Sequence, residues 1–223
     1  MYKRTKIFKP YIFRMIKRYA SKSDYRILDV GAGNHSASLF KTLCPECHYY
    51  GIDINKNYNN DEYDFSHMVD FYEMDLTKLD FEVIPADFFD VVRFSHVIEH
   101  LHNGELVIEA LVPKLRQGGM IYIEYPSVRS VSFPSCKGTL NFYDDPTHVK
   151  LYSLHEILNL VTKNGMRVIK CGTRRDWVRI ILLPVFALYS LMRHKCLTAG
   201  VFWDVLGFAE FVVAVKPVDK VTP

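Results

Sequence analysis

Glycine and aspartate residues stand where two short apolar runs end, and their spacing suits the binding of a ribose-containing ligand. Residues 27–34, ILDVGAGN, run from an apolar stretch into a glycine turn. Glycine lets the backbone approach a ligand closely, and a helix that begins after the turn offers free N–H groups. Asp53 ends the next apolar run, 20 residues after Gly33. A carboxylate there can accept hydrogen bonds from both hydroxyls of a ribose.

Two features disfavour a dinucleotide as that ligand. Asp29 lies two residues before Gly31. An anion at this position is unfavourable beside a pyrophosphate but is compatible with a cationic sulfonium. The turn reads GAGNHS and not GxGxxG. Asp75 and Leu76 follow a third apolar run, where a carboxylate can accept from an adenine amino group. A nucleotide-dependent oxidoreductase or epimerase stays open as an alternative, which binding of NAD would support.

The elements that position these residues alternate along the chain. Strands are predicted over 26–30, 49–54, 71–76, 89–95 and 119–125, with helical spacing over 36–43 and 106–115. This alternation predicts an α/β fold with a mostly parallel, twisted sheet and helices on both faces. Residues 117–119, QGG, are interpreted as the glycine cap of the helix before the fifth strand.

The pattern changes after residue 126. Residues 127–146 are rich in Ser, Pro and Gly and predict a long loop of the kind that often covers a substrate. A helix over 153–163 follows, in which Ser153 and Glu156 predict a capping box. Strands are expected over 166–171 and 210–215, the last of them antiparallel to its neighbour.

The motifs ILDVGAGN, GIDIN, EMDL and FDVVRFSHVIEHL, in this order and spacing, resemble those of class I S-adenosylmethionine-dependent methyltransferases. The resemblance covers about residues 25–125, with a further part to 170, and is closest to a subgroup with quinone-pathway and polysaccharide-pathway enzymes. It implies a methyltransferase with a Rossmann-like fold and S-adenosylmethionine as cofactor. It also implies the cofactor contacts: Gly31 and Gly33 at the methionine part, Asp29 near its amino group, Asp53 at the ribose, Asp75 and Leu76 at the adenine, and Ser95 and His96 beside the sulfonium, with Ala32 and Ile54 as further contacts.

The stretch after the fourth predicted strand departs from the quinone-pathway relatives. Those relatives have a Glu where this chain has His96, and their acid, acid and His set can bind a divalent metal. Residues His96, Glu99 and His100 keep part of that pattern, but the departure removes a hard oxygen ligand. We therefore expect no metal here and interpret Glu99 and His100 as residues that order the following helix.

His148 is the second candidate catalytic residue, beside His96. The stretch DPTHVKLYSLHEI, residues 145–157, resembles one in methyltransferases of polysaccharide and glycoconjugate pathways. Methyl transfer to oxygen or nitrogen needs removal of a proton, and histidine titrates in a suitable range. Two roles stay open for His148, which are contact with the acceptor and bracing of the loop through backbone hydrogen bonds. Tyr143 and Asp144 are further candidates for substrate binding.

The two ends of the chain carry cationic and apolar residues together. Residues 11–20 predict an amphipathic helix, which we interpret as a cap on the edge of the domain in preference to a membrane contact. The apolar run 180–192 has 13 residues, too few to span a bilayer. Basic and aromatic residues flank it, so residues 177–195 favour a peripheral membrane contact or a lipid-linked acceptor over a core or homodimer contact.

Composition excludes several classes of protein. The chain has 223 residues, of which 49% are hydrophobic, and a formal net charge of +3. These values predict a packed domain and no nucleic-acid partner. Five scattered cysteines do not suggest a disulfide framework, and Cys44 and Cys47 are interpreted as ordinary thiols. With no secretory signal we expect a cytoplasmic protein, peripheral on the inner membrane face if the apolar run contacts lipid.

The expected organisation is one domain over 1–223. Its parts are a basic N-terminal helix (1–24), a cofactor-binding core (25–126), a substrate loop and helix (127–173), an apolar helical insertion (174–209) and a final strand (210–215). The expected acceptor is a small or lipid-linked glycan, methylated on a sugar hydroxyl. The alternatives are a quinone or natural-product O- or C-methyltransferase, and a non-catalytic scaffold with the same fold.

Overall fold

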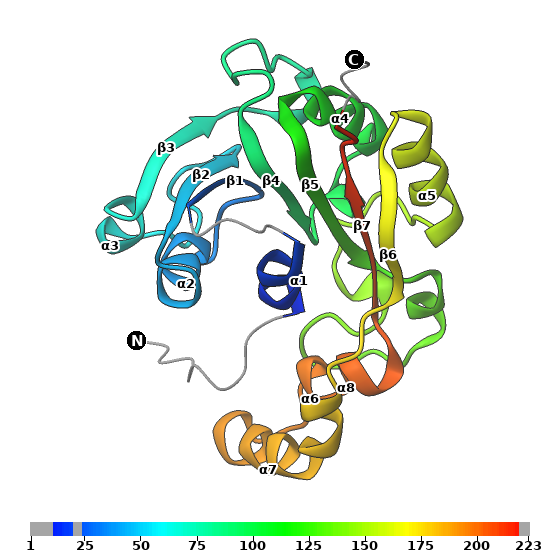
Figure 1. Ribbon diagram of the computed structural model, residues 1–223. Helices are drawn as coiled ribbons and strands as arrows, with labels where there is room; N and C mark the ends of the chain where they lie inside the picture. The colour runs from blue at the N-terminus through cyan, green and yellow to red at the C-terminus, as the bar shows by residue number, and fades with distance from the viewer. Residues whose placement is uncertain (1–10, 20–23, 219–223) are drawn as a thin grey trace.

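The computed structural model describes residues 11–19 and 24–218, and their strands form one sheet (Figure 1). Its order is β3-β2-β1-β4-β5-β7-β6. Strands β1 to β5 run parallel, whereas β7 lies antiparallel between β5 and β6. The strands are β1 (Tyr25–Val30), β2 (Cys47–Asp53), β3 (Met68–Glu73), β4 (Phe89–Ser95), β5 (Leu115–Pro126), β6 (Arg167–Thr173) and β7 (Ala209–Val215).

Helices cover both faces of the sheet, as the sequence predicts. Successive strand residues point to opposite faces, so Leu28 joins one apolar cluster and Ile27 the other. The first cluster includes residues of α4 and α5, and the second includes residues of α1 and α2. The helices are α1 (Tyr11–Tyr19), α2 (Ser36–Leu43), α3 (Glu62–Phe65), α4 (Gly104–Leu111), α5 (Leu154–Lys163), α6 (Trp177–Ile181), α7 (Leu183–His194) and α8 (Ala199–Leu206).

The predicted edge helix at residues 11–20 is confirmed as α1. Its residues Ile12, Phe13, Met15 and Ile16 are buried, and the Phe13 ring lies 4.7 Å from that of Phe40 in α2. The cationic residues 3, 4, 6 and 9, which also entered the membrane hypothesis, lie outside the described residues.

The interpretation of residues 117–119 as a helix cap is wrong. Helix α4 ends at Leu111, a short 3-10 turn follows over Val112–Lys114, and Gly118 and Gly119 lie inside β5. Pro113 cannot continue the helix, because it lacks an N–H and its ring clashes with the preceding turn. A Cβ on Gly119 would meet the Arg116 carbonyl oxygen at 2.7 Å, near the register shift between β4 and β5. Gly119 therefore allows β4 and β5 to approach closely where their pairing is irregular.

Helices α6, α7 and α8 form an insertion between β6 and β7, and in Figure 1 they lie together at the lower end of the molecule. The apolar run forms part of α6 and most of α7, which has 12 residues. Within the described residues, no helix has both the length and the apolar character needed to cross a bilayer.

Candidate active site

The glycine turn after β1 is hydrogen-bonded to the end of β2. The N–H groups of Gly31 and Ala32 donate to the Ile52 carbonyl at 2.8 and 3.0 Å. Gly31 has a φ of +75°, and a Cβ there would lie 2.5 Å from Val97 Cγ2. A Cβ on Gly33 would lie 2.5 Å from the Tyr58 ring. The turn therefore needs glycine at both positions, and it sets the start of α2 at Ser36.

The predicted ribose and adenine residues lie at the ends of the two neighbouring strands. Asp53 ends β2, and its partial burial raises the pKa of its carboxyl above the ordinary value. Ile54 beside it leaves 67% of its surface exposed. Asp75 follows β3 and accepts from both the N–H and the hydroxyl of Thr77, which lowers the pKa of its carboxyl. Asp75 thereby caps the short turn that begins at Leu76.

Asp29 is fully buried and already has protein partners. It accepts from the hydroxyls of Ser36 and Tyr49 at 2.5 and 2.7 Å and forms an ion pair with Arg93 of β4. A direct contact with a ligand amino group would have to displace one of these donors. Arg93 was not among the predicted site residues, although a charged residue inside the apolar strand FDVVRFS is an unusual feature of the sequence.

His96 lies directly after β4, between two buried carboxylates. Its Nδ1 is 3.1 Å from Glu99 Oε1 and its Nε2 is 3.2 Å from Glu124 Oε1. Burial by itself would lower the pKa of His96, but the hydrogen bonds to Glu124 and Glu99 raise it to about 9. His96 is therefore protonated at neutral pH. Glu124, a residue of β5 that sequence reasoning missed, accepts from Tyr122 and lies 3.6 Å from Arg174.

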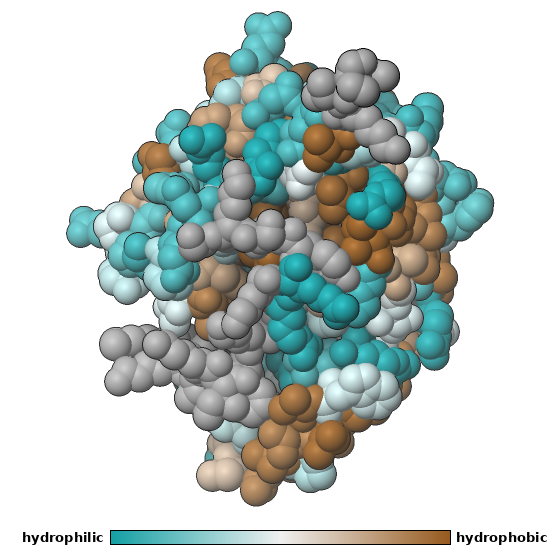
Figure 2. Space-filling model, in the orientation of Figure 1, coloured by the Kyte–Doolittle hydropathy of each residue, from teal (hydrophilic) through white to brown (hydrophobic). Residues whose placement is uncertain are grey.

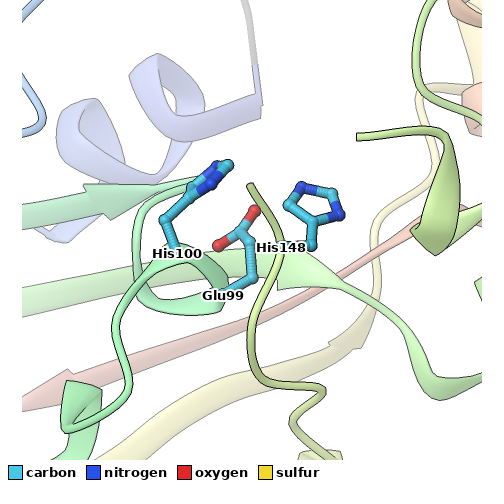
Figure 3. Close-up of side chains that lie close together, drawn as sticks. All are labelled: Glu99, His100 and His148. Carbon is cyan, nitrogen blue, oxygen red and sulfur yellow. The ribbon is translucent and has the colours of Figure 1, made fainter. Parts of the chain in front are cut away.

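The structure brings His148 next to Glu99 and His100, as Figure 3 shows. The Val149 N–H donates to the Glu99 carbonyl at 2.8 Å, which attaches this segment to the turn after β4. His148 Nδ1 lies 2.6 Å from the Phe142 carbonyl oxygen. His148 therefore makes the backbone hydrogen bond that bracing of the loop requires, and its catalytic role stays a prediction.

The two remaining substrate candidates differ in their availability. Tyr143 leaves 73% of its surface exposed. One oxygen of Asp144 accepts from the N–H groups of Leu140 and Asn141 at 3.0 and 2.9 Å, so it orders the loop. The loop also packs against α8, where the Trp203 indole donates to the Thr139 carbonyl.

Residues 4–170 match the sequence family described as a methyltransferase domain. The chain belongs to this family. An uncharacterised methyltransferase, YcgJ of Bacillus subtilis, is 26% identical over 159 residues, which are 68% of this chain and 61% of that protein. The match thus spans less than two thirds of this curated relative.

Solved structures with the same fold include a methyltransferase of Archaeoglobus fulgidus that is described as SAM dependent. It is 21% identical, with a TM-score of 0.57 over 92% of this chain and 93% of the other. The phosphoethanolamine N-methyltransferase 2 of Haemonchus contortus, solved with S-adenosyl-L-methionine, is 17% identical, with a TM-score of 0.65 over 92% of this chain and 52% of the other. These two likenesses show that the chain has the fold of these methyltransferases.

The fold also brings the predicted cofactor residues together at one edge of the sheet. Gly31, Asp53, Asp75 and Ser95 follow or end β1, β2, β3 and β4, which lie next to one another in the sheet order β3-β2-β1-β4. Because the carboxyl ends of parallel strands share one edge, these residues lie along one line. The half-buried carboxyl of Asp53 and the exposed side chain of Ile54 suit a ribose and an adenine face.

Proposed function

We propose that the methyltransferase methylates a sugar hydroxyl of a small or lipid-linked glycan in a surface polysaccharide or glycolipid pathway. The main support is the cluster of Glu99, His100 and His148, close to the expected methyl position at Ser95 and His96. A hydroxyl that attacks a methyl carbon must lose its proton, and a neutral imidazole can receive it.

The histidines take different roles in this proposal. S-adenosylmethionine supplies, when bound, a methyl group on a positively charged sulfur. His148 donates through Nδ1 to the Phe142 carbonyl, which leaves its Nε2 lone pair able to accept a proton. His96 already carries a proton between Glu99 and Glu124, so it positions these carboxylates and is not the base. Tyr143 contacts the acceptor from the loop.

The surface of α6 and α7 supports an acceptor that is held at a membrane. The side chains of Ile181, Leu188 and Met192 leave 74%, 59% and 70% of their surface exposed. Figure 2 shows a hydrophobic area at this lower end of the molecule. Arg193 and Lys195 are exposed at the end of α7, and Asp176, the acidic residue among 174–197, is buried. Apolar and cationic groups together suit an anionic bilayer surface.

A cavity of about 580 Å³ between α1, the end of β6 and the start of α6 adds to this support. Its lining includes four cationic side chains and the aromatic rings of Tyr11, Trp177 and Phe211. The cations are Arg14, Arg18, Lys170 and Arg175. We propose that it holds a phosphate group of the acceptor or of a lipid, with the protein peripheral on the inner face of the membrane.

The first experiment is calorimetric binding of S-adenosylhomocysteine to wild-type protein and to Asp53→Ala, with NAD as a control ligand. The second measures transfer of labelled methyl groups to sugar nucleotides, glycolipids and quinol analogues. Activity on sugars that His148→Ala loses and His155→Ala keeps would support the proposal. Activity on quinol analogues alone would replace it with the quinone or natural-product alternative.

Membrane contact is tested separately by flotation with vesicles. We expect binding to vesicles that contain anionic lipid, and none to zwitterionic vesicles. The double variant Leu188→Ser/Met192→Ser should lose this binding. A concentration-dependent dimer that the same variant abolishes, without vesicle binding, would instead assign the surface to a second copy of the chain.

A further inference from the structure

Glu99 is a buried acid with one oxygen unused. Only 1% of its surface is exposed. Its Oε1 pairs with His96, and its Oε2 is buried without a hydrogen-bond partner. Leaving a carboxylate oxygen buried and unpartnered costs free energy, unless a cation or donor occupies the adjacent space.

The two histidines near Glu99 are each anchored through Nδ1, and His148 Nε2 lies 4.0 Å from Asp145 Oδ2. His148 Nδ1 lies 2.6 Å from the Phe142 carbonyl oxygen, and His100 Nδ1 lies 3.2 Å from that of Thr147 and 2.9 Å from its hydroxyl. A ring whose Nδ1 donates to a backbone carbonyl keeps an Nε2 lone pair for a metal. One ring nitrogen of each histidine and one oxygen of Glu99 lie within 4.8 Å of one another.

We propose that Glu99, His100 and His148 bind a divalent transition-metal ion of the Zn²⁺ type, with one position open to the acceptor. Two imidazoles and one carboxylate are a common set for such ions, with metal–ligand bonds of about 2.0–2.2 Å. In Figure 3 the carboxylate of Glu99 lies between the imidazole rings of His100 and His148. Mg²⁺ and Ca²⁺ prefer oxygen ligands and fit less well.

This site revises our expectation of no metal. That expectation rested on position 96, where a histidine replaces an acid. In the structure His96 is engaged by Glu99 and Glu124 and offers no free nitrogen. His148, 48 residues beyond His100 in the chain, supplies the third ligand.

A second cluster of similar composition differs from the first in that the oxygens of its buried carboxylate have hydrogen-bond donors. His35, Asp61 and Asp64 also lie close together. There, however, Asp64 accepts from His35 Nδ1 at 2.6 Å, from the Asp61 N–H at 3.0 Å and from the Ser38 hydroxyl. These oxygens are satisfied within the protein, so this second cluster serves as an internal control.

The role of the metal rests on the proposed function. A bound ion would lower the pKa of the acceptor hydroxyl, and the hydroxyl proton would pass to solvent. Methyl transfer would then form the carbon–oxygen bond as the carbon–sulfur bond breaks, with the electron pair left on sulfur. In the metal-bound enzyme His148 is thus a ligand and not the base.

The test is a titration of chelator-treated protein with Co²⁺, followed by visible absorption, and with Zn²⁺ by competition. We expect a ligand-field band in wild-type protein. Binding should weaken at least roughly tenfold in His148→Ala, His100→Ala and Glu99→Gln. His35→Ala and His155→Ala should bind as the wild type does. Binding of S-adenosylhomocysteine by each variant shows that it is folded.

Two outcomes separate this inference from the proposed function. Protein that binds S-adenosylhomocysteine but gives no Co²⁺ band, or equal bands in wild type and His148→Ala, would overturn the metal site and leave the function in place. Co²⁺ binding at these three residues in a protein that methylates no sugar would overturn the function and leave the metal site.

Discussion

The glycine turn at the end of β1 and the insertion α6–α8 are built on opposite principles. Around the turn, apolar side chains such as Ile27 and Leu28 are buried, and the functional polar groups lie at the strand ends. In the insertion, Ser190 and Asp204 are buried while Leu188 and Met192 are exposed. The first region is a normal hydrophobic core with a polar edge, and the second has polar groups inside.

Charged groups hold the insertion to the sheet. Arg174 lies 3.6 Å from both Glu124 and Asp204, and Arg179 lies 3.2 Å from Asp204. Asp176 pairs with Arg14 of α1 at 3.2 Å. The comparison shows that a segment anchored by buried ion pairs can keep its apolar side chains exposed. The predictions below test that difference.

Removal of Glu124 should have the largest effect. Glu124→Ala removes one of the two buried anions beside Arg174 and one of the two beside His96, which should cost about 3–5 kcal/mol of unfolding free energy. Glu109→Ala breaks only the 3.7 Å pair with exposed Lys163 and should cost less than about 1 kcal/mol. Urea denaturation measures both. Equal, small losses would show that ion pairs do not anchor the insertion.

Alanine variants of two glycines with similar φ angles can distinguish the cost of backbone strain from the cost of a steric clash. Gly31 and Gly165 have φ values of +75° and +73°, but a Cβ clashes only at Gly31 and meets nothing within 4 Å at Gly165. Both alanine variants should lose about 1–2 kcal/mol from backbone strain. Gly31→Ala should lose a further ~1–3 kcal/mol through overpacking and bind S-adenosylhomocysteine more weakly. Identical losses in denaturation would contradict the packing argument.

The raised pKa of the Asp53 carboxyl predicts how cofactor binding depends on pH. In the proposed site its charged form would accept from the ribose, and burial raises its pKa, so affinity should be present above that raised pKa and fall as pH drops through it. Each pH unit below the pKa should cost up to about tenfold in Kd. Asp75, whose pKa is lowered, keeps its charge further into acid. Calorimetry on Asp53→Asn should give a flatter profile, and an unchanged slope would assign the titration elsewhere.

The smallest effect on stability is expected on α7. Leu188→Ser should change the unfolding free energy by less than about 0.5 kcal/mol, because this side chain is 59% exposed. Leu111→Ala, at a fully buried position of α4, should cost about 2–5 kcal/mol. A large loss in Leu188→Ser, measured by thermal denaturation, would mean that α7 packs on the domain and would remove the contrast.

Elements with strong local signals were predicted closely. Strand β4 and helix α2 begin and end at the predicted residues, and the capping box of Ser153 and Glu156 is present. Pairs of glycines were less informative. Gly118 and Gly119 suit a helix end by local rules, but the shift in pairing between β4 and β5 placed them in a strand.

Some residues of the candidate site could be found from local sequence patterns, and others could not. Gly31, Asp53 and Asp75 could be found from the sequence because each follows its own strand, and parallel pairing then aligns the strand ends. Arg93, Glu124 and Arg174 could not be assigned, because their partners lie far away in the chain. Only their charge, within or next to a strand, marked them as unusual.

The sequence by itself determined the order of elements, the glycine turn and the carboxylates at the strand ends, because hydrophobic period and turn chemistry act over a few residues. The tertiary structure decided which charged groups lie next to one another. It placed His96 between Glu99 and Glu124, and it brought His148 to Glu99 and His100. These effects depend on burial and distance between segments far apart in the chain, and local sequence patterns do not encode them.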